Sequence, residues 1–225
     1  MNALAYAIVN DSTAPELTHV ALCTMAADIQ TAYARDYAPA HGLLPIVVVV
    51  CAAAEVPAGA RQGHLVDEIP EAPGAAAYHT TDAHGRPMIR LGVDACRGEG
   101  GSLLDAISEA LDHEIKEAAK NPFVNRWLSG PWSGKKVADE PCDPVQGSPY
   151  RDGSTLLANF TLPAWGDAND VDGPYDFRGV LSAPFACAPS GYLAFDDGTQ
   201  AFGELVPLRK REAIAQHGRV ARFAR

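Results

Sequence analysis

The segment Ile46 to Cys51, an apolar run made mostly of valine, most strongly limits the fold of this chain. β-branched residues favour strands, and a run without charge is typical of a strand covered on both faces. The run therefore predicts a central strand covered on both faces, as in an α/β (α+β) architecture. The surrounding apolar stretch, Leu43 to Ala54, is too short to cross a bilayer and contains Pro45.

Hydrophobic periodicity and turn residues predict the other elements of the first half. In chain order we expect a strand at Leu4 to Val9, a long helix from about Ala14 to Ala38, a hairpin of Ala75 to Thr80 with Met88 to Val93 around Asp82-Ala83-His84-Gly85, and a helix at Leu103 to Lys120. Pro39 and Gly42 are expected to end the first helix, and Asn121-Pro122 the last. The remaining third is rich in Gly and Pro, with short strands expected at Thr155 to Leu162 and Gly191 to Phe195.

Charge and cysteine content limit the functional classes. The formal net charge of −10 argues against a general nucleic-acid binder. From Leu208 onward, however, six basic residues stand against Glu212 alone, which predicts a basic C-terminal tail with a disordered, solvated end. The five cysteines are scattered and form no Cys-x-x-Cys pair, as expected of a reduced intracellular chain. The N-terminus has no cationic region, so we expect no signal peptide.

The segment Asp112-His113-Glu114-Ile115-Lys116-Glu117 carries the clearest functional signal. His113 and Glu117 are one helical turn apart, so both side chains can reach one ion. Imidazole and carboxylate groups both ligate zinc. Glu114 points elsewhere and can act as a base toward a metal-bound water.

The faces of this helix support two interpretations. At roughly 100° per residue, the apolar positions form one stripe, and Glu114 lies inside the apolar arc, where a carboxylate needs a partner. A charged face contains Asp105, Glu109, Asp112, Lys116 and Lys120. An amphipathic helix with its polar side chains outward needs no metal, and so short a pattern also arises by chance.

A zinc site needs at least three protein ligands, the last usually from a later segment. The nearest candidates are Asp139, Glu140, Cys142 and Asp143. Cys142 also fits a packed loop as a small apolar residue, and the acids also fit a solvated turn bracketed by prolines. The remaining histidines, which we expect to be surface or structural, are His19, His41, His64, His79, His84 and His217.

Several segments, in order, resemble a family of zincin-like proteins encoded by phages, prophages and some bacteria. The motif helix resembles the zincin pattern His-Glu-x-x-His, with Glu117 in place of the second histidine. The other matching segments are Arg35-Asp36-Tyr37-Ala38-Pro39, Asn121-Pro122 with Asn125, Glu140-Pro141-Cys142-Asp143-Pro144-Val145, Asn159-Phe160-Thr161-Leu162-Pro163-Ala164-Trp165, Tyr175-Asp176, Ala183-Pro184-Phe185 and Gly191-Tyr192. Two positions depart from the family pattern: Asp112, where a serine is expected, and Gln146, where an acid often follows.

The resemblance implies an α/β (α+β) zincin-like domain over residues 1–205. A mixed, twisted sheet, a long N-terminal helix and the motif helix are expected in 1–122, a loop-rich part in 123–205, and the basic tail at 206–225. It implies His113 and Glu117 as ligands of zinc or another divalent cation, Glu140 or Asp143 as the third ligand, and Glu114 as base. The expected function is a metal-dependent hydrolase, most simply a peptidase acting on a peptide or protein. The alternative is a phage virion structural or assembly protein that keeps an inactive zincin scaffold and binds other phage structural proteins. The expected location is the host cytoplasm or the virion, with no membrane association.

Overall fold

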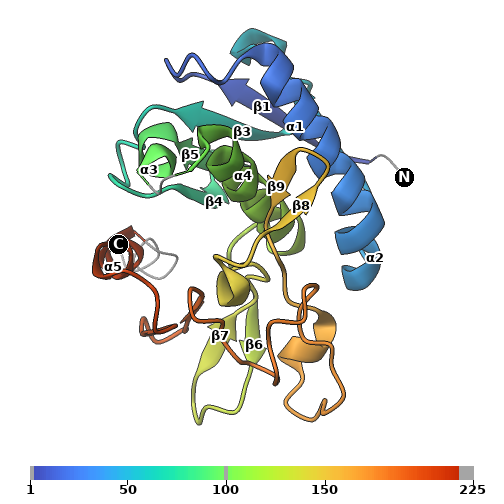
Figure 1. Ribbon diagram of the computed structural model, residues 1–225, viewed down its shortest axis with the longest axis vertical. Coiled ribbons are helices and arrows are strands. Elements are labelled where there is room, and N and C mark those ends of the chain that lie inside the picture. Colours follow the sequence, from blue (N-terminus) through green and yellow to red (C-terminus); the bar gives the residue numbers. More distant parts are fainter. Residues whose placement is uncertain (1–2, 99–100, 218–225) are drawn as a thin grey trace. The chain divides into compact units, whose positions relative to one another are not determined.

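The computed structural model describes residues 3–98 and 101–217 and divides into two compact units (Figure 1). The first unit comprises Met1–Phe123 and Arg151–Leu157. The second comprises Val124–Tyr150 and Ala158–Arg225. The candidate catalytic helix lies in the first unit, so that unit is described first.

A five-stranded mixed sheet forms the centre of the first unit, which confirms the predicted α/β class. Its strands, in chain order, are β1 (Leu4–Asn10), β2 (Ile46–Val50), β3 (Arg61–Val66), β4 (Ala77–Thr81) and β5 (Pro87–Gly92). Their order across the sheet is β2-β1-β3-β5-β4. The strands β2, β1, β3 and β5 are parallel to one another. The strand β4 runs antiparallel to β5 and forms the predicted hairpin with it.

The valine-rich strand β2 lies at an edge of this sheet, so its predicted central position is wrong. It pairs with β1 on one side only, and Val47 is 40% exposed. The side-chain oxygen of Gln30, on the neighbouring helix, accepts a hydrogen bond from the Val48 N–H at 2.9 Å. The helix therefore supplies a partner for one backbone donor that an edge strand would otherwise leave to solvent.

The helices of the first unit pack on this sheet. They are α1 (His19–Ala32), a π-helical turn (Tyr33–Tyr37), α2 (Ala38–His41), a 3₁₀ turn (Ala53–Glu55), α3 (Val93–Arg97) and α4 (Leu103–Lys120). α1 begins after Thr18, whose hydroxyl oxygen accepts from the Ala21 N–H at 3.2 Å, and not at Ala14 as expected. Pro39 does not end the helical segment as expected, because α2 follows the π-helical turn without a break and continues to His41, whereas Gly42 at φ 62° ends it as expected. The bounds of α4 agree with the prediction.

One lateral row of the sheet determines where α4 can lie. The strand registers align Val50, Ile8, Gly63, Ile89 and His79 from one edge to the other. A Cβ on Gly63 would lie 2.9 Å from the Ile8 side chain and 3.9 Å from Leu111 of α4. The glycine therefore lets the helix approach the sheet, and α1 and α4 lie on this same face (Figure 1).

Side chains of the first unit also hold the C-terminal half of α4 by its carbonyl oxygens. The hydroxyls of Tyr6 and Tyr37 donate to the carbonyls of Ile115 and Lys116 at 3.4 and 2.8 Å. Arg61 donates to the Ala118 carbonyl at 2.5 Å and to the Tyr6 hydroxyl at 2.9 Å. A cation near the helix C-terminus also interacts favourably with the helix dipole. Burial raises the pKa of Tyr6 to about 12, so its hydroxyl stays protonated and can donate.

A tight turn sets the register of the β4–β5 hairpin. One carboxylate oxygen of Asp82 accepts from the backbone N–H groups of His84 and Arg86 at 2.8 and 2.9 Å. These bonds and the Arg86 guanidinium hold the pKa of Asp82 down at about 2. Gly85 adopts φ 75°, which suits glycine. The resulting register places His79 opposite Ile89.

The rest of the chain contains short elements. They are β6 (Trp127–Ser129), β7 (Lys136–Ala138), a 3₁₀ turn (Asp143–Val145), β8 (Tyr150–Asp152), β9 (Thr155–Leu157), a 3₁₀ turn (Pro163–Gly166), β10 (Tyr192–Ala194), β11 (Gln200–Phe202) and α5 (Leu208–His217). Of the strand expected at Thr155 to Leu162, only β9 forms, whereas β10 agrees with the strand expected near Gly191 to Phe195. An aromatic core that includes Trp165, Phe185 and Phe195 holds the second unit together.

The described part of the basic tail is helical. Arg211 of α5 donates to the carbonyls of Val206 and Gly203 at 2.8 and 3.1 Å, which anchors the start of the helix. The disordered end expected for the tail is therefore wrong for residues 208–217, although this part is partly exposed, with Leu208 71% exposed. Residues 218–225 lie outside the described residues. Across the described ranges, no helix combines the length and apolar character needed to cross a membrane.

Candidate metal centre

His113 and Glu117 meet on α4 as their spacing predicts. Both are buried, and the His113 Nε2 lies 3.2 Å from a carboxylate oxygen of Glu117. Two ligands of one tetrahedral zinc ion, each about 2.1 Å from it, are separated by roughly 3.4 Å. The imidazole and carboxylate atoms therefore already have the separation that a shared ion requires.

Glu114 is also buried and has the partner that its place in the apolar arc predicted. Its carboxylate lies 3.1 Å from the Nδ1 of His79 on β4. His79 is only 3% exposed, so it belongs to the buried centre of the unit. From the sequence, His79 was expected to be a surface or a structural histidine. The expectation of a surface position is wrong. His79 is the residue of this centre that sequence reasoning missed.

The contact of the His79 Nε2 with a backbone carbonyl fixes the orientation of the imidazole ring. The Nε2 lies 3.2 Å from the carbonyl oxygen of Asn121, which can only accept, so Nε2 carries a proton and donates it. The Nδ1 then faces Glu114 at 3.1 Å and Glu117 at 3.7 Å. Two buried carboxylates thus converge on one imidazole nitrogen.

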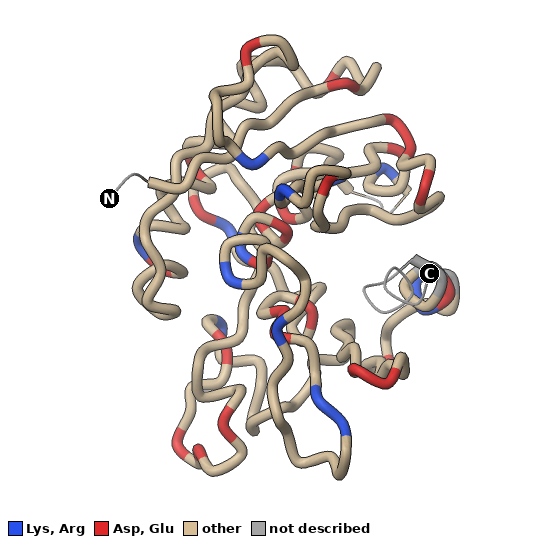
Figure 2. Tube along the Cα trace, turned by 180° about the vertical axis from the view of Figure 1, so that it is seen from behind, with Lys and Arg blue, Asp and Glu red and all other residues tan. Residues whose placement is uncertain are grey.

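The expected charged face of α4 contains a buried ion pair. Asp112 and Lys116 have no exposed surface, and the Lys116 ammonium donates to the Asp112 carboxylate at 2.6 Å. The ammonium also lies 6.0 Å from the centre of the Tyr37 ring, within cation–π range. The interpretation of α4 as a helix with its polar residues in solvent is therefore wrong at these positions. Figure 2 shows the charged positions along the chain.

The acidic loop predicted to supply a third ligand belongs to the second unit. Asp139, Glu140 and Asp143 are buried, which contradicts the interpretation of these acids as solvated turn charges. Asp139 is ion-paired with Arg126 at 3.1 Å. Cys142 is fully buried, as the small apolar interpretation expects. Glu140 and Asp143 stay predicted ligands, and the described residues include buried His, Glu and Asp groups that can hold a metal ion.

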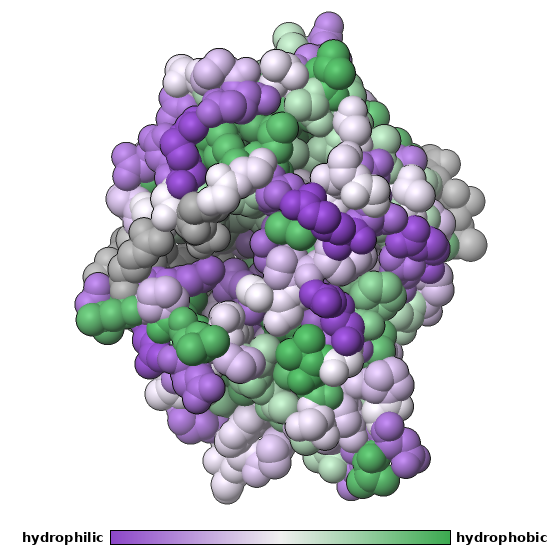
Figure 3. Space-filling model, in the orientation of Figure 1, coloured by the Kyte–Doolittle hydropathy of each residue, from purple (hydrophilic) through white to green (hydrophobic). Residues whose placement is uncertain are grey.

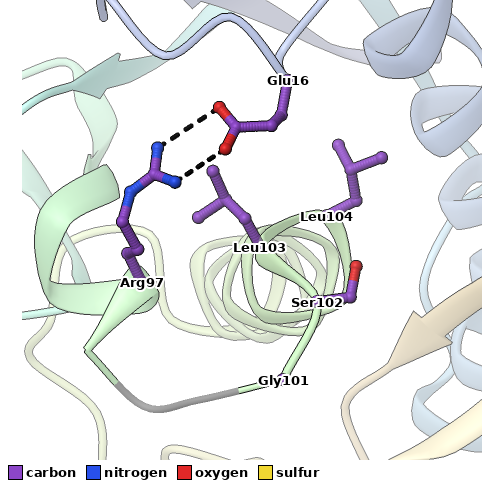
Figure 4. Close-up of a pocket in the computed structure, with 6 residues that line it drawn as sticks. All are labelled: Glu16, Arg97, Gly101, Ser102, Leu103 and Leu104. Atoms are coloured by element: carbon purple, nitrogen blue, oxygen red, sulfur yellow. Dashed lines mark hydrogen bonds and ion pairs between the residues drawn. The ribbon is translucent and has the colours of Figure 1, made fainter.

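A separate pocket of about 240 Å³ lies at the N-terminal end of α4 (Figure 4). Its lining residues are Glu16, Arg97, Gly101, Ser102, Leu103 and Leu104. Arg97 and Glu16 neutralise each other there through two contacts of 2.6 and 3.3 Å. His113 is ten residues beyond Leu103 along α4, which corresponds to a rise of about 15 Å along the helix axis. This pocket is therefore not the candidate metal centre.

Comparisons with protein-family models, with curated proteins and with solved structures found no match to the chain.

Proposed function

We propose that the chain is a metal-dependent hydrolase that cleaves peptide bonds. The observation that carries this proposal is the 3.2 Å approach of His113 and Glu117 on one buried helix, with Glu114 between them in sequence. Imidazole and carboxylate ligands suit zinc and several other divalent cations. The choice of a peptide substrate rests on the resemblance of the motif helix to zincins.

In this mechanism His113 and Glu117 hold the cation, and Glu140 or Asp143 is the proposed further ligand. A divalent ion bound there would polarise a substrate carbonyl and make a water molecule more acidic. Glu114 accepts the proton of the attacking water and delivers it to the leaving amine. Its contact with His79 keeps the carboxylate within the buried centre.

Metal content and peptide cleavage test this proposal. The purified chain should retain at least one divalent ion, and His113→Ala should bind less metal and unfold at a lower temperature, because an ion bound only by the folded state adds to its stability. Glu114→Gln should keep the metal and fold but lose cleavage of a peptide library. Glu109→Gln, the same chemical change on the same helix, is the control and should cleave normally. Equal, negligible metal in the wild type and His113→Ala would refute the proposal.

A second candidate function is suggested by the charge distribution. The chain is acidic overall, while the anchored helix α5 begins a basic segment. We propose as the alternative a phage virion or assembly protein, in which the basic segment binds an acidic surface of another structural protein. A metal-free, catalytically silent chain that loses such binding when residues 206–225 are removed would favour this alternative over the hydrolase.

A further inference from the structure

The carboxylate of Glu117 faces two different histidines with its two oxygen atoms. Oε1 lies 3.2 Å from the Nε2 of His113, and Oε2 lies 3.7 Å from the Nδ1 of His79. Among the described residues, groups of converging ligand atoms contain Glu117 with one histidine or with the other, and no group contains both. Glu117 therefore lies between two imidazoles that do not share one position.

Both separations are compatible with metal coordination. Two ligand atoms that are each about 2.0 to 2.2 Å from one zinc ion can be at most about 4.4 Å apart. Each imidazole nitrogen and its facing oxygen satisfy this limit separately. A carboxylate that uses one oxygen for each of two ions is the usual bridge in dinuclear centres, where the ions are about 3.5 to 4 Å apart.

The His79 ring is oriented as a metal ligand would be. Its Nε2 donates to the Asn121 carbonyl, which directs the lone pair of Nδ1 toward Glu114 and Glu117. Either a proton or a metal ion can hold an imidazole nitrogen and two carboxylates together in this arrangement. Histidines that ligate metals typically donate their other ring N–H to a backbone carbonyl or a carboxylate.

We propose that Glu117 bridges two cation positions, one at His113 and a second at His79. This inference rests on the proposed function and extends it to a two-ion hydrolase. Glu114, whose carboxylate is 3.1 Å from the His79 Nδ1, then borders the second position. The combination of nitrogen and oxygen ligands suits zinc or manganese. Two adjacent ions are found in aminopeptidases and phosphatases, among other hydrolases, so amide and phosphoester substrates are the classes to examine.

Metal stoichiometry distinguishes the two positions. Chain stripped with EDTA and reloaded with Mn²⁺ should bind about two ions, whereas His79→Ala and His113→Ala should each bind about one. His64→Ala is the matched control. His64 lies on β3 and has its own carboxylate partner, Asp11, at 2.8 Å, so this variant should still bind two ions. Circular dichroism establishes that each variant is folded.

Electron paramagnetic resonance of the wild type gives a second readout that needs no variant. Two Mn²⁺ ions joined by one carboxylate couple magnetically, so full loading should replace the six-line signal of an isolated ion with a coupled spectrum. One ion in the wild type that His79→Ala retains would overturn this inference, because His79 would then be only a protonated partner of the glutamates. That result leaves the proposed function intact, whereas a wild type without bound metal overturns both.

Discussion

The pair formed by Asp112 and Lys116 has the largest expected effect of any single contact in α4. Both charges are fully removed from solvent, so each depends on the other for compensation. Removing one partner of a buried pair usually costs about 3 to 5 kcal/mol, because the remaining charge stays buried. The ion pair with Lys116 compensates the charge of an aspartate at this fully buried position.

We predict that Asp112→Asn lowers the free energy of unfolding by about 3 to 5 kcal/mol. Urea denaturation provides the measurement. Asp112→Leu combined with Lys116→Met should be less destabilising than either single change, since no unpaired charge is left in the interior. The exposed pair of Glu16 and Arg97 is the control, and Glu16→Gln should lower the stability far less than Asp112→Asn does. Equal, small losses for both pairs would contradict the prediction.

At the scale of elements, the packing of α4 on the sheet depends on Gly63 in the middle of β3. We predict that Gly63→Ala destabilises the chain by about 1 to 3 kcal/mol, because the new methyl group would lie 2.9 Å from the Ile8 side chain. Ile8→Val removes the atom that the new methyl group meets. The double variant should therefore be more stable than the sum of the two single losses predicts, which a double-mutant cycle in urea measures. Strict additivity would show that the helix, and not Ile8, receives the strain.

Some elements could be predicted from the sequence because their signals are local. α4 has a helical apolar stripe with a clear stop, and the β4–β5 hairpin has turn residues at its centre. The strand β3 was missed because Arg61, Gln62, Gly63 and His64 hide its apolar pattern. Two of these residues serve tertiary contacts that the local sequence does not show. Arg61 donates to the carbonyl of Ala118, and Gly63 leaves room for α4. The predicted position of β2 was wrong because an apolar run indicates only that the faces of a strand are covered. It does not indicate how many neighbouring strands pair with it.

The candidate centre shows the same division between local and tertiary signals. The spacing of His113 and Glu117 was sufficient to bring them together, and the place of Glu114 in the apolar arc was sufficient to predict its burial. His79 had a signal that went unused, since the predicted hairpin pairs it with Ile89, whose side chain faces the core. The burial of Asp112 and Lys116 could not be deduced from periodicity, because a charged stripe looks the same in solvent or against a second layer.

At the scale of the whole molecule, buried tyrosines limit stability at alkaline pH. Burial raises the pKa of Tyr6 to about 12 and raises that of Tyr33 as well, whereas tyrosines in the unfolded chain titrate near 10. The unfolded state therefore loses these protons first. Stability is complete below about pH 10 and is lost as the pH rises from 10 toward 12.

We predict that Tyr6→Phe reduces this alkaline loss. Because the pKa of Tyr6 rises from about 10 in the unfolded chain to about 12 in the folded one, the wild type should lose up to about 3 kcal/mol of stability between pH 10 and 12 from this residue. The variant is expected to be less stable than the wild type at pH 8, because its hydroxyl no longer donates to Ile115, but its stability should fall less steeply above pH 10. Urea unfolding across this range gives both slopes, and parallel curves would exclude Tyr6 as the cause.

Exposed apolar side chains occur at several places in the described part of the chain. Large apolar side chains such as Val20 and Leu44 are exposed, and the face drawn in Figure 3 shows hydrophobic residues in separate patches among hydrophilic ones. Scattered apolar residues of this kind are usual on folded proteins and carry no assignment of a partner. The buried centre therefore remains the feature from which function is best sought.

The length of the turn held by Asp82 determines which residue of β4 faces the candidate metal centre. His79 reaches Glu114 only because a fixed number of residues separates it from Ile89 around the turn. One residue inserted or deleted there would present a neighbour of His79 to the helix, since a slip of one position reverses the faces of a strand. Such a chain would keep α4 with Glu114 and Glu117 while losing the imidazole that faces these two glutamates. Length variation in a solvent-exposed turn would thus remove chemistry from the interior without altering a single residue of the motif helix.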